Sequence, residues 1–261
     1  MSVGHQRLKN IPKTLRWRQV VELLDDGGSV GEIATLSAQA IDKALSRATR
    51  DPALTEVVYL LALLPGAARQ HDTVRALGGI GIDAGSEPSL LDILAGLERA
   101  VDREARMRGG RTDLGEIAQL AAANSITTLI APTLPGLFST TATDVRSALA
   151  RLDTPDQFAR LSRTFFSELV QRSLNYYLSR EYAKHLGRGE AFATLADQET
   201  FRDALSVHCY QTALIVERYS ADWFSKAKFE GGITRARAST LARAALSKLR
   251  KELSHRSDPD G

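Results

Sequence analysis

Hydrophobic residues recur at helical spacing along nearly the whole chain. In residues 89–107, for example, Leu90, Leu94 and Val101 fall on one face of a helix and charged residues on the other. Runs in which polar residues alternate with β-branched or aromatic ones, the pattern of a half-buried strand, are missing. The pattern therefore predicts an all-α protein with about eight helices.

Capping signals indicate where several of these helices begin. Ser29 and Glu32 have the spacing of a capping box, in which each side chain satisfies the backbone of the other residue. Asp51 followed by Pro52 marks another start, because proline suits the first turn of a helix. The helix expected at about 53–64 is apolar around much of its circumference, which predicts a central position.

The second half of the chain is expected to form three long helices, over 154–187 (one helix, or two with a kink), 197–224 and 234–253. We divide the chain accordingly into four parts. These are an N-terminal helical region (1–130), a connection rich in Pro, Gly and Thr (131–144), a C-terminal long-helix bundle on which the first region packs (145–254), and a tail expected to be disordered (255–261).

Composition narrows the functional class. The 261 residues include 34 Lys and Arg against 31 Asp and Glu, a formal charge of +3, which is a small excess for a dedicated nucleic-acid-binding protein. The single cysteine, Cys209, excludes an intrachain disulfide and a cysteine-built zinc site. The longest aliphatic block, 57–66, is far shorter than the roughly 20 residues of a membrane span. We expect a soluble, cytoplasmic protein that makes no membrane contact.

Motifs for cofactors, metals and covalent catalysis are weak. The glycine-rich stretch 77–85 lacks the Gly-Lys-Ser/Thr ending of a phosphate-binding loop, and the five histidines are scattered. His208 and Cys209 are adjacent, but neighbouring residues of a helix point about 100° apart, so the two side chains do not meet. No cofactor and no metal site is expected.

One short stretch has the form of a catalytic signature. In "REYAKH", Arg180 is followed five residues later by His185, which resembles the Arg-x4–6-His motif of HEPN-domain ribonucleases. The resemblance covers six residues and implies a helical, metal-independent ribonuclease in which arginine stabilises phosphate charge and histidine transfers protons. Glu181, however, is an acid beside that site. The same residues also fit an ordinary helix end, with cations in the last turn and Gly187 as the cap.

Two further groups are candidates for binding. Aromatic and lysine residues alternate where the 197–224 helix gives way to a loop, a composition typical of protein interfaces or of a closed core. These residues are Tyr219, Trp223, Phe224, Lys226, Lys228 and Phe229. Basic residues concentrate in the N-terminal arm and the last helix, where they could contact phosphates or form a solvated face. They include Arg16, Arg18, Arg235, Arg237, Arg243, Lys248, Arg250 and Lys251.

No catalytic constellation is complete, so the sequence favours a non-enzymatic helical adaptor or scaffold that binds another protein subunit. Its Ala- and Arg-rich composition suggests a bacterial multi-protein complex. Two alternatives stay open, the ribonuclease built on Arg180 and His185 and a nucleic-acid-binding accessory protein that uses the basic arm and the last helix. The oligomeric state is not predicted.

Overall fold

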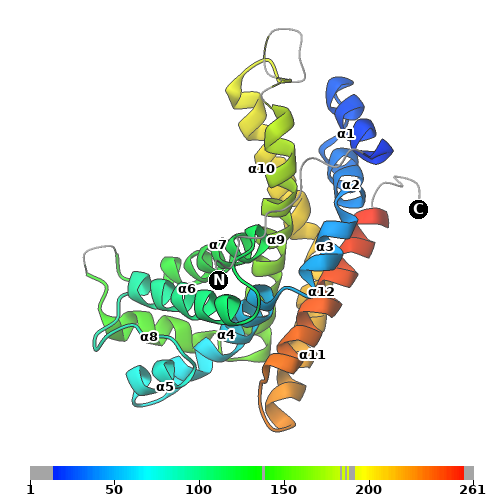
Figure 1. The fold of residues 1–261 in the computed structure, drawn as a ribbon. Helices are drawn as coiled ribbons and strands as arrows, with labels where there is room; N and C mark the ends of the chain where they lie inside the picture. The colour runs from blue at the N-terminus through cyan, green and yellow to red at the C-terminus, as the bar shows by residue number, and fades with distance from the viewer. Residues whose placement is uncertain (1–13, 137–138, 183, 186, 188–191, 256–261) are drawn as a thin grey trace.

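A computed structural model describes residues 14–136, 139–182, 184–185, 187 and 192–255. Within these ranges the chain is helical and contains no β-strand (Figure 1). The N-terminal arm before Thr14 and the tail from residue 256 onward, on which two sequence predictions depend, lie outside the described residues. The helices are α1 (Leu15–Asp25), α2 (Val30–Ala40), α3 (Asp42–Ala48), α4 (Pro52–Arg69), α5 (Thr73–Gly79), α6 (Leu90–Met107), α7 (Asp113–Ile130), α8 (Ala142–Arg151), α9 (Pro155–Tyr182), α10 (Leu195–Thr212), α11 (Leu214–Phe229) and α12 (Arg235–His255), with a short 3₁₀ turn (Ala131–Thr133) after α7.

The capping signals in the sequence are confirmed. Ser29 Oγ accepts a hydrogen bond from the Glu32 amide at 3.3 Å, and the Glu32 carboxylate accepts one from the Ser29 amide at 3.1 Å. Asp51 Oδ1 accepts from the amides of Ala53 and Leu54, so it satisfies two orphan donors at the start of α4. These side chains fix where α2 and α4 begin.

The described residues form twelve α-helices, where about eight were expected. The region expected as one helix over 197–224 is two helices, α10 and α11, which meet at Ala213, and the C-terminal part therefore has four long helices instead of three. The helix expected to stop before Pro65 continues to Arg69. Proline removes one hydrogen bond from a helix interior, and Pro65 is buried in the core, where packing offsets that loss.

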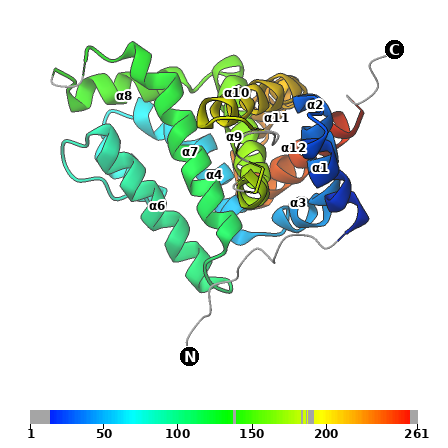
Figure 2. The ribbon, with the colours of Figure 1, turned by 90° about the horizontal axis from the view of Figure 1, so that it is seen from above.

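One hydrophobic core joins the helices of both halves of the chain. The long helix α9 packs against α7, α10 and α11, and α4 packs against α5, α6, α7, α8 and α12, so α4 has the central position predicted for it. Seen from above, α6 and α8 lie on one side of α9, and α1, α2, α3 and α12 lie on the other (Figure 2). No helix among the described residues is long and apolar enough to cross a membrane.

The last helix closes the structure against early parts of the chain. Besides α4, α12 packs on α2, α3 and α11, and its buried leucines and alanines form one apolar stripe. Thr35 Oγ in α2 donates a hydrogen bond to the Leu253 carbonyl at 2.9 Å. Residues more than 200 positions apart in the sequence are therefore held side by side.

Candidate functional site

The aromatic segment at the end of α11 divides between core and surface. Phe224 is fully buried and stacks on Phe158 of α9, with ring centroids 4.3 Å apart. Trp223 is half-buried and stacks on the same Phe158 ring at 5.9 Å. Tyr219 is also half-buried and lies under the Lys248 ammonium of α12. Three of the four aromatic residues of the segment thus help to hold α11 on its neighbours.

Phe229, the last residue of α11, is the exception. Its side chain is 92% exposed, the largest value among the exposed large hydrophobic residues that the structure describes. A phenylalanine placed in water gives up the roughly 1.5–3 kcal/mol that burial of its side chain would contribute. Phe229 therefore adds nothing to the core, and its ring is free for contact with another molecule.

A groove of about 430 Å³ lies beside this helix end. Lys228, the residue before Phe229, lines the groove together with Asp153, and Arg69 and Gln70 of the α4 end line it as well. The remaining lining residues are small or apolar, namely Leu63, Gly66, Ala67, Ala76 and Ile80. The groove thus combines an apolar lining with polar groups of both signs, and we call it the α4–α11 groove.

Asp153 holds the groove together. Its side chain is 8% exposed and forms ion pairs with Lys228 of α11 and, at 3.4 Å, with Arg69 of α4. The Lys228 ammonium also lies 4.7 Å from the centre of the Phe224 ring. One buried carboxylate therefore fixes the ends of α4 and α11 relative to each other, and Phe229 extends from a rigid support. Lys226, in contrast, is exposed and forms an ion pair with Glu230 at 3.8 Å.

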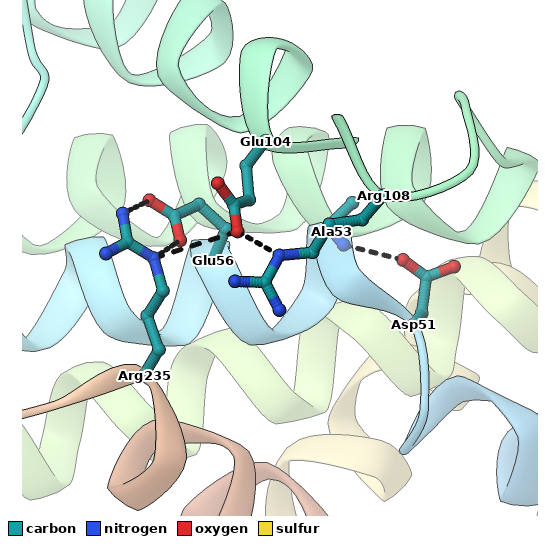
Figure 3. Close-up of polar contacts among 6 residues, drawn as sticks. All are labelled: Asp51, Ala53, Glu56, Glu104, Arg108 and Arg235. Carbon is teal, nitrogen blue, oxygen red and sulfur yellow. Dashed lines mark hydrogen bonds and ion pairs between the residues drawn. The ribbon is translucent and has the colours of Figure 1, made fainter. Parts of the chain in front are cut away.

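The start of α12 takes part in an ion network around two buried carboxylates, those of Glu56 and Glu104 (Figure 3). Arg235 donates from Nε and Nη2 to both carboxylate oxygens of Glu56, at 2.6 and 2.8 Å, and its guanidinium lies 3.9 Å from Glu104. Glu104 is also paired with Arg108. The hydrogen bond to Glu56 is the main reason that the pKa of Arg235 is raised, so the guanidinium stays charged. Both carboxylates are matched by arginine, which makes this network a structural clamp between α4, α6 and α12.

Other basic residues of α12 are also engaged within the fold. Arg237 donates to the carbonyls of Ala227, Gly232 and Glu230 and so caps the end of α11. Arg250 donates to Asp42 of α3 at 2.7 Å. The members of the basic group that are exposed are Arg16 and Arg18 of α1 and Arg235, Arg243, Lys248 and Lys251 of α12, of which Arg235 is held by Glu56. Internal contacts thus engage part of the basic group, and nucleic-acid contact stays a prediction.

Arg180 and His185 have different surroundings. Arg180, in the last turn of α9, is exposed and donates to the Tyr176 hydroxyl at 3.0 Å, with its guanidinium 4.8 Å from the ring centre of Tyr176. The Tyr176 hydroxyl in turn donates to Asp113 of α7 at 3.1 Å. Burial is the main reason that the pKa of Tyr176 is raised. Arg180 thus belongs to a polar contact between α9 and α7.

His185 is 7% exposed and lies against Asp25, the last residue of α1. Its Nδ1 atom is 2.5 Å from Asp25 Oδ1, but neither ring nitrogen has a directed hydrogen bond to a described residue. The helix α9 ends at Tyr182, before Gly187, which does have the positive φ of +146° expected of a glycine at a chain reversal. Arg180 and His185 share no partner among the residues that the structure describes, so the ribonuclease stays a prediction.

Glu181, between them, has a structural role. Its carboxylate is 4% exposed, lies 3.5 Å from Trp17 Nε1 of α1 and accepts a hydrogen bond from Lys184 at 2.9 Å. Trp17 also meets Tyr177 edge to face at 6.1 Å. Glu181 is therefore part of the contact that docks α1 on α9.

No family model matches this chain. The searches of curated proteins and of solved structures also found no match. Its function has to be inferred from its own surfaces and side chains.

The last candidates for a chemical role are Cys209, the metal-ligating residue types and a second hollow. Cys209 is completely buried in α10, and burial raises the pKa of its thiol to about 12, so the nucleophilic thiolate is absent near neutral pH. The described residues contain no cluster of three or more histidine, cysteine or acidic side chains placed to hold a metal ion. A second hollow, of about 350 Å³, lies between the end of α4, α5 and the starts of α6 and α8, with His71, Glu87 and Arg146 in its lining.

Sequence reasoning missed the clamp at Glu56 and the α4–α11 groove. Glu56 gave a usable signal, because a single carboxylate inside an otherwise apolar helix requires a basic partner. The groove gave none, since its lining residues come from α4, α5, Asp153 and α11. Only the tertiary structure brings these segments together.

Proposed function

We propose that this protein is a non-enzymatic helical adaptor that binds another protein through the C-terminal end of α11. The observation that carries the proposal is the exposure of Phe229 beside the α4–α11 groove. Large aromatic residues dominate the binding energy of protein interfaces, because they bury much area while few side-chain torsions are fixed.

The support of Phe229 strengthens this proposal. Phe224 and Trp223 anchor α11 on α9, and the pair between Lys228 and Asp153 anchors its last turn. A partner that covers Phe229 therefore meets a surface that is already ordered, which lowers the entropic cost of binding. The groove offers apolar lining to side chains of the partner and polar groups of both signs at which hydrogen bonds can form.

The state of the buried ionisable groups also favours a binding role. Glu56 and Glu104 are neutralised by arginine, and the Cys209 thiol stays protonated. General acid–base and nucleophilic catalysis require such groups to be free and to exchange protons near neutral pH.

The proposal is tested by photo-crosslinking in the native cells. A photoreactive phenylalanine analogue replaces Phe229 in one variant and Leu91 in a matched control, because Leu91 of α6 is also highly exposed, at 77%. We expect a discrete crosslink to one other protein from position 229 and none from position 91. With that protein purified, Phe229→Ser should weaken binding at least about tenfold, while Leu91→Ser leaves it unchanged.

A crosslink pattern that is the same at both positions, or binding that Phe229→Ser does not weaken, would contradict the proposal. Loss of folding is not an alternative explanation, because Phe229 makes no core contact. Its replacement should change the free energy of unfolding by less than about 0.5 kcal/mol.

A further inference from the structure

A second exposed face runs along the junction of α10 and α11, which lie end to end (Figure 1). Ala213 joins the two helices: its amide donates to the Cys209 carbonyl at 3.0 Å, and its carbonyl accepts from the amides of Val216 at 3.0 Å and Glu217 at 3.3 Å, with the backbone still in the right-handed helical region (φ −72°, ψ 0°). Residues three or four apart within each helix share one face, and the exposed positions keep this spacing past Ala213. Asp203, Val207, Tyr210, Leu214 and Arg218 follow this spacing, and we call them the junction face.

The centre of the junction face is apolar and exposed. Val207 is 56% exposed, Tyr210 is 41% exposed and Leu214 is 37% exposed. Arg163 of α9 contacts Tyr210, the middle residue of this centre. Its Cζ atom lies 3.9 Å from the centre of the Tyr210 ring, and its Nε donates to the Tyr210 carbonyl at 3.0 Å. The Tyr210 ring is thus held in place without being buried.

Opposite charges lie at the two ends of this apolar centre. Asp203 and Arg218 are both exposed, and neither forms an ion pair or side-chain hydrogen bond with another described residue. They are separated by 15 positions, about 22 Å of helix, which prevents them from pairing with each other within one chain. Their midpoint along the helix falls next to Tyr210.

We infer that the junction face binds a second copy of this chain in a two-fold symmetric dimer. A two-fold axis beside Tyr210 runs the two helices antiparallel, so that Val207 of each copy meets Leu214 of the other. The same axis brings Asp203 of each copy toward Arg218 of the other, twice over. A symmetric interface requires a surface of this kind, which is complementary to the same surface on the second copy.

The geometry limits the contact between the two copies to the middle of the end-to-end helices α10 and α11. Asp203 and Arg218 lie about 11 Å from the axis along the helix, within reach of each other when helices pack 8–10 Å apart. Glu199 and Asp222, which would oppose each other as like charges, lie about 17 Å from the axis. Crossed helices have diverged at that distance, and salt screens the remaining repulsion.

This interface is separate from the end of α11 where we place the partner protein. Phe229 lies 15 positions beyond Leu214, about 22 Å along the helix. A dimer therefore leaves both copies of Phe229 uncovered. The two inferences can fail independently, because one concerns self-association of the purified chain and the other concerns a different protein.

A charge-swap series tests the dimer by sedimentation velocity on the full purified chain, over about 1–200 µM, which spans micromolar dissociation constants. The wild type should sediment as a dimer at the upper concentrations. Asp203→Arg alone and Arg218→Asp alone each place like charges across the axis and should raise the dissociation constant at least about tenfold. The double variant should restore the wild-type value. Arg243→Asp, on the exposed side of α12, is the matched control and should change nothing.

Rescue in the double variant distinguishes this interface from every arrangement in which Asp203 and Arg218 do not meet across two copies. Val207→Gln provides a second variant without a charge change, and it should also weaken the dimer. A wild type that stays monomeric throughout the concentration range would overturn the inference. A dimer that none of these variants weakens, or single variants that the second swap fails to rescue, would overturn it as well.

Discussion

Removal of the Arg235 side chain should destabilise this protein. In Arg235→Ala, Glu56 loses both of its hydrogen bonds, and the structure shows it no other ion-pair partner among the described residues. The Glu56 side chain is only 3% exposed, so its charge is desolvated and relies on the guanidinium. A buried charge left without its partner is among the larger destabilising changes, typically about 3–5 kcal/mol.

Two features of the structure set the expected size of this loss. The Arg235 side chain is 44% exposed, so its removal opens a path for water to Glu56 and places the loss from the unpaired charge at the lower end of that range, about 3 kcal/mol. Loss of the contact between the Arg235 guanidinium and the Tyr59 ring, 4.4 Å apart, adds about 0.5–1 kcal/mol. We expect a total loss of about 3–4 kcal/mol at pH 7.

Urea unfolding of wild type and variant at pH 7 measures this difference. Arg243→Ala is the control, an exposed arginine on the same helix whose loss should cost less than about 0.5 kcal/mol. A loss in Arg235→Ala below about 1 kcal/mol would refute the clamp.

Three further predictions concern the core. Cys209 should resist iodoacetamide in the native protein at pH 8, since burial raises the pKa of its thiol to about 12. In urea it should react fully, as measured by mass spectrometry, and rapid alkylation of the native protein would contradict this prediction. Phe158→Ala should cost about 3–5 kcal/mol in urea unfolding, because Phe158 supports the rings of Trp223 and Phe224, and a loss near zero would show that α11 is not anchored there. Gly115→Ala should cost about 1–3 kcal/mol, since a Cβ atom there would lie 2.8 Å from Ala53 Cβ, whereas Gly79→Ala at the open end of α5 should not destabilise the protein.

Local signals in the sequence predicted helix starts better than helix ends. A cap is made by side chains within three residues of one another, so Ser29 with Glu32 and Asp51 with Pro52 could be read directly. The end of α4 and the break at Ala213 depend on packing between distant segments. Pro65 and Ala213 are both buried. Tertiary packing keeps the helix intact at Pro65, although proline favours a break, and separates two helices at Ala213, although alanine favours a continuous helix.

The candidate site shows the same division. Phe224 and Phe229 were grouped because they are close in the sequence, yet five helical positions separate their directions by about 140°, which is why one is in the core and the other in solvent. Periodicity could have separated them. The arginines of α12 could not have been sorted in this way, because the carboxylates that engage Arg235 and Arg250 lie about 180 and 208 residues earlier in the chain.

The docking of α12 on α2 and α4 has a consequence for biosynthesis. A ribosome adds about 5–20 residues per second, and α12 follows α4 by more than 160 residues. The apolar face of α4 that α12 covers, together with the charged Glu56, therefore stays without its partner for roughly 10–30 s of synthesis. During that interval the nascent chain exposes a surface of the kind that chaperones bind, and its N-terminal helices complete their packing only after the last helix has emerged.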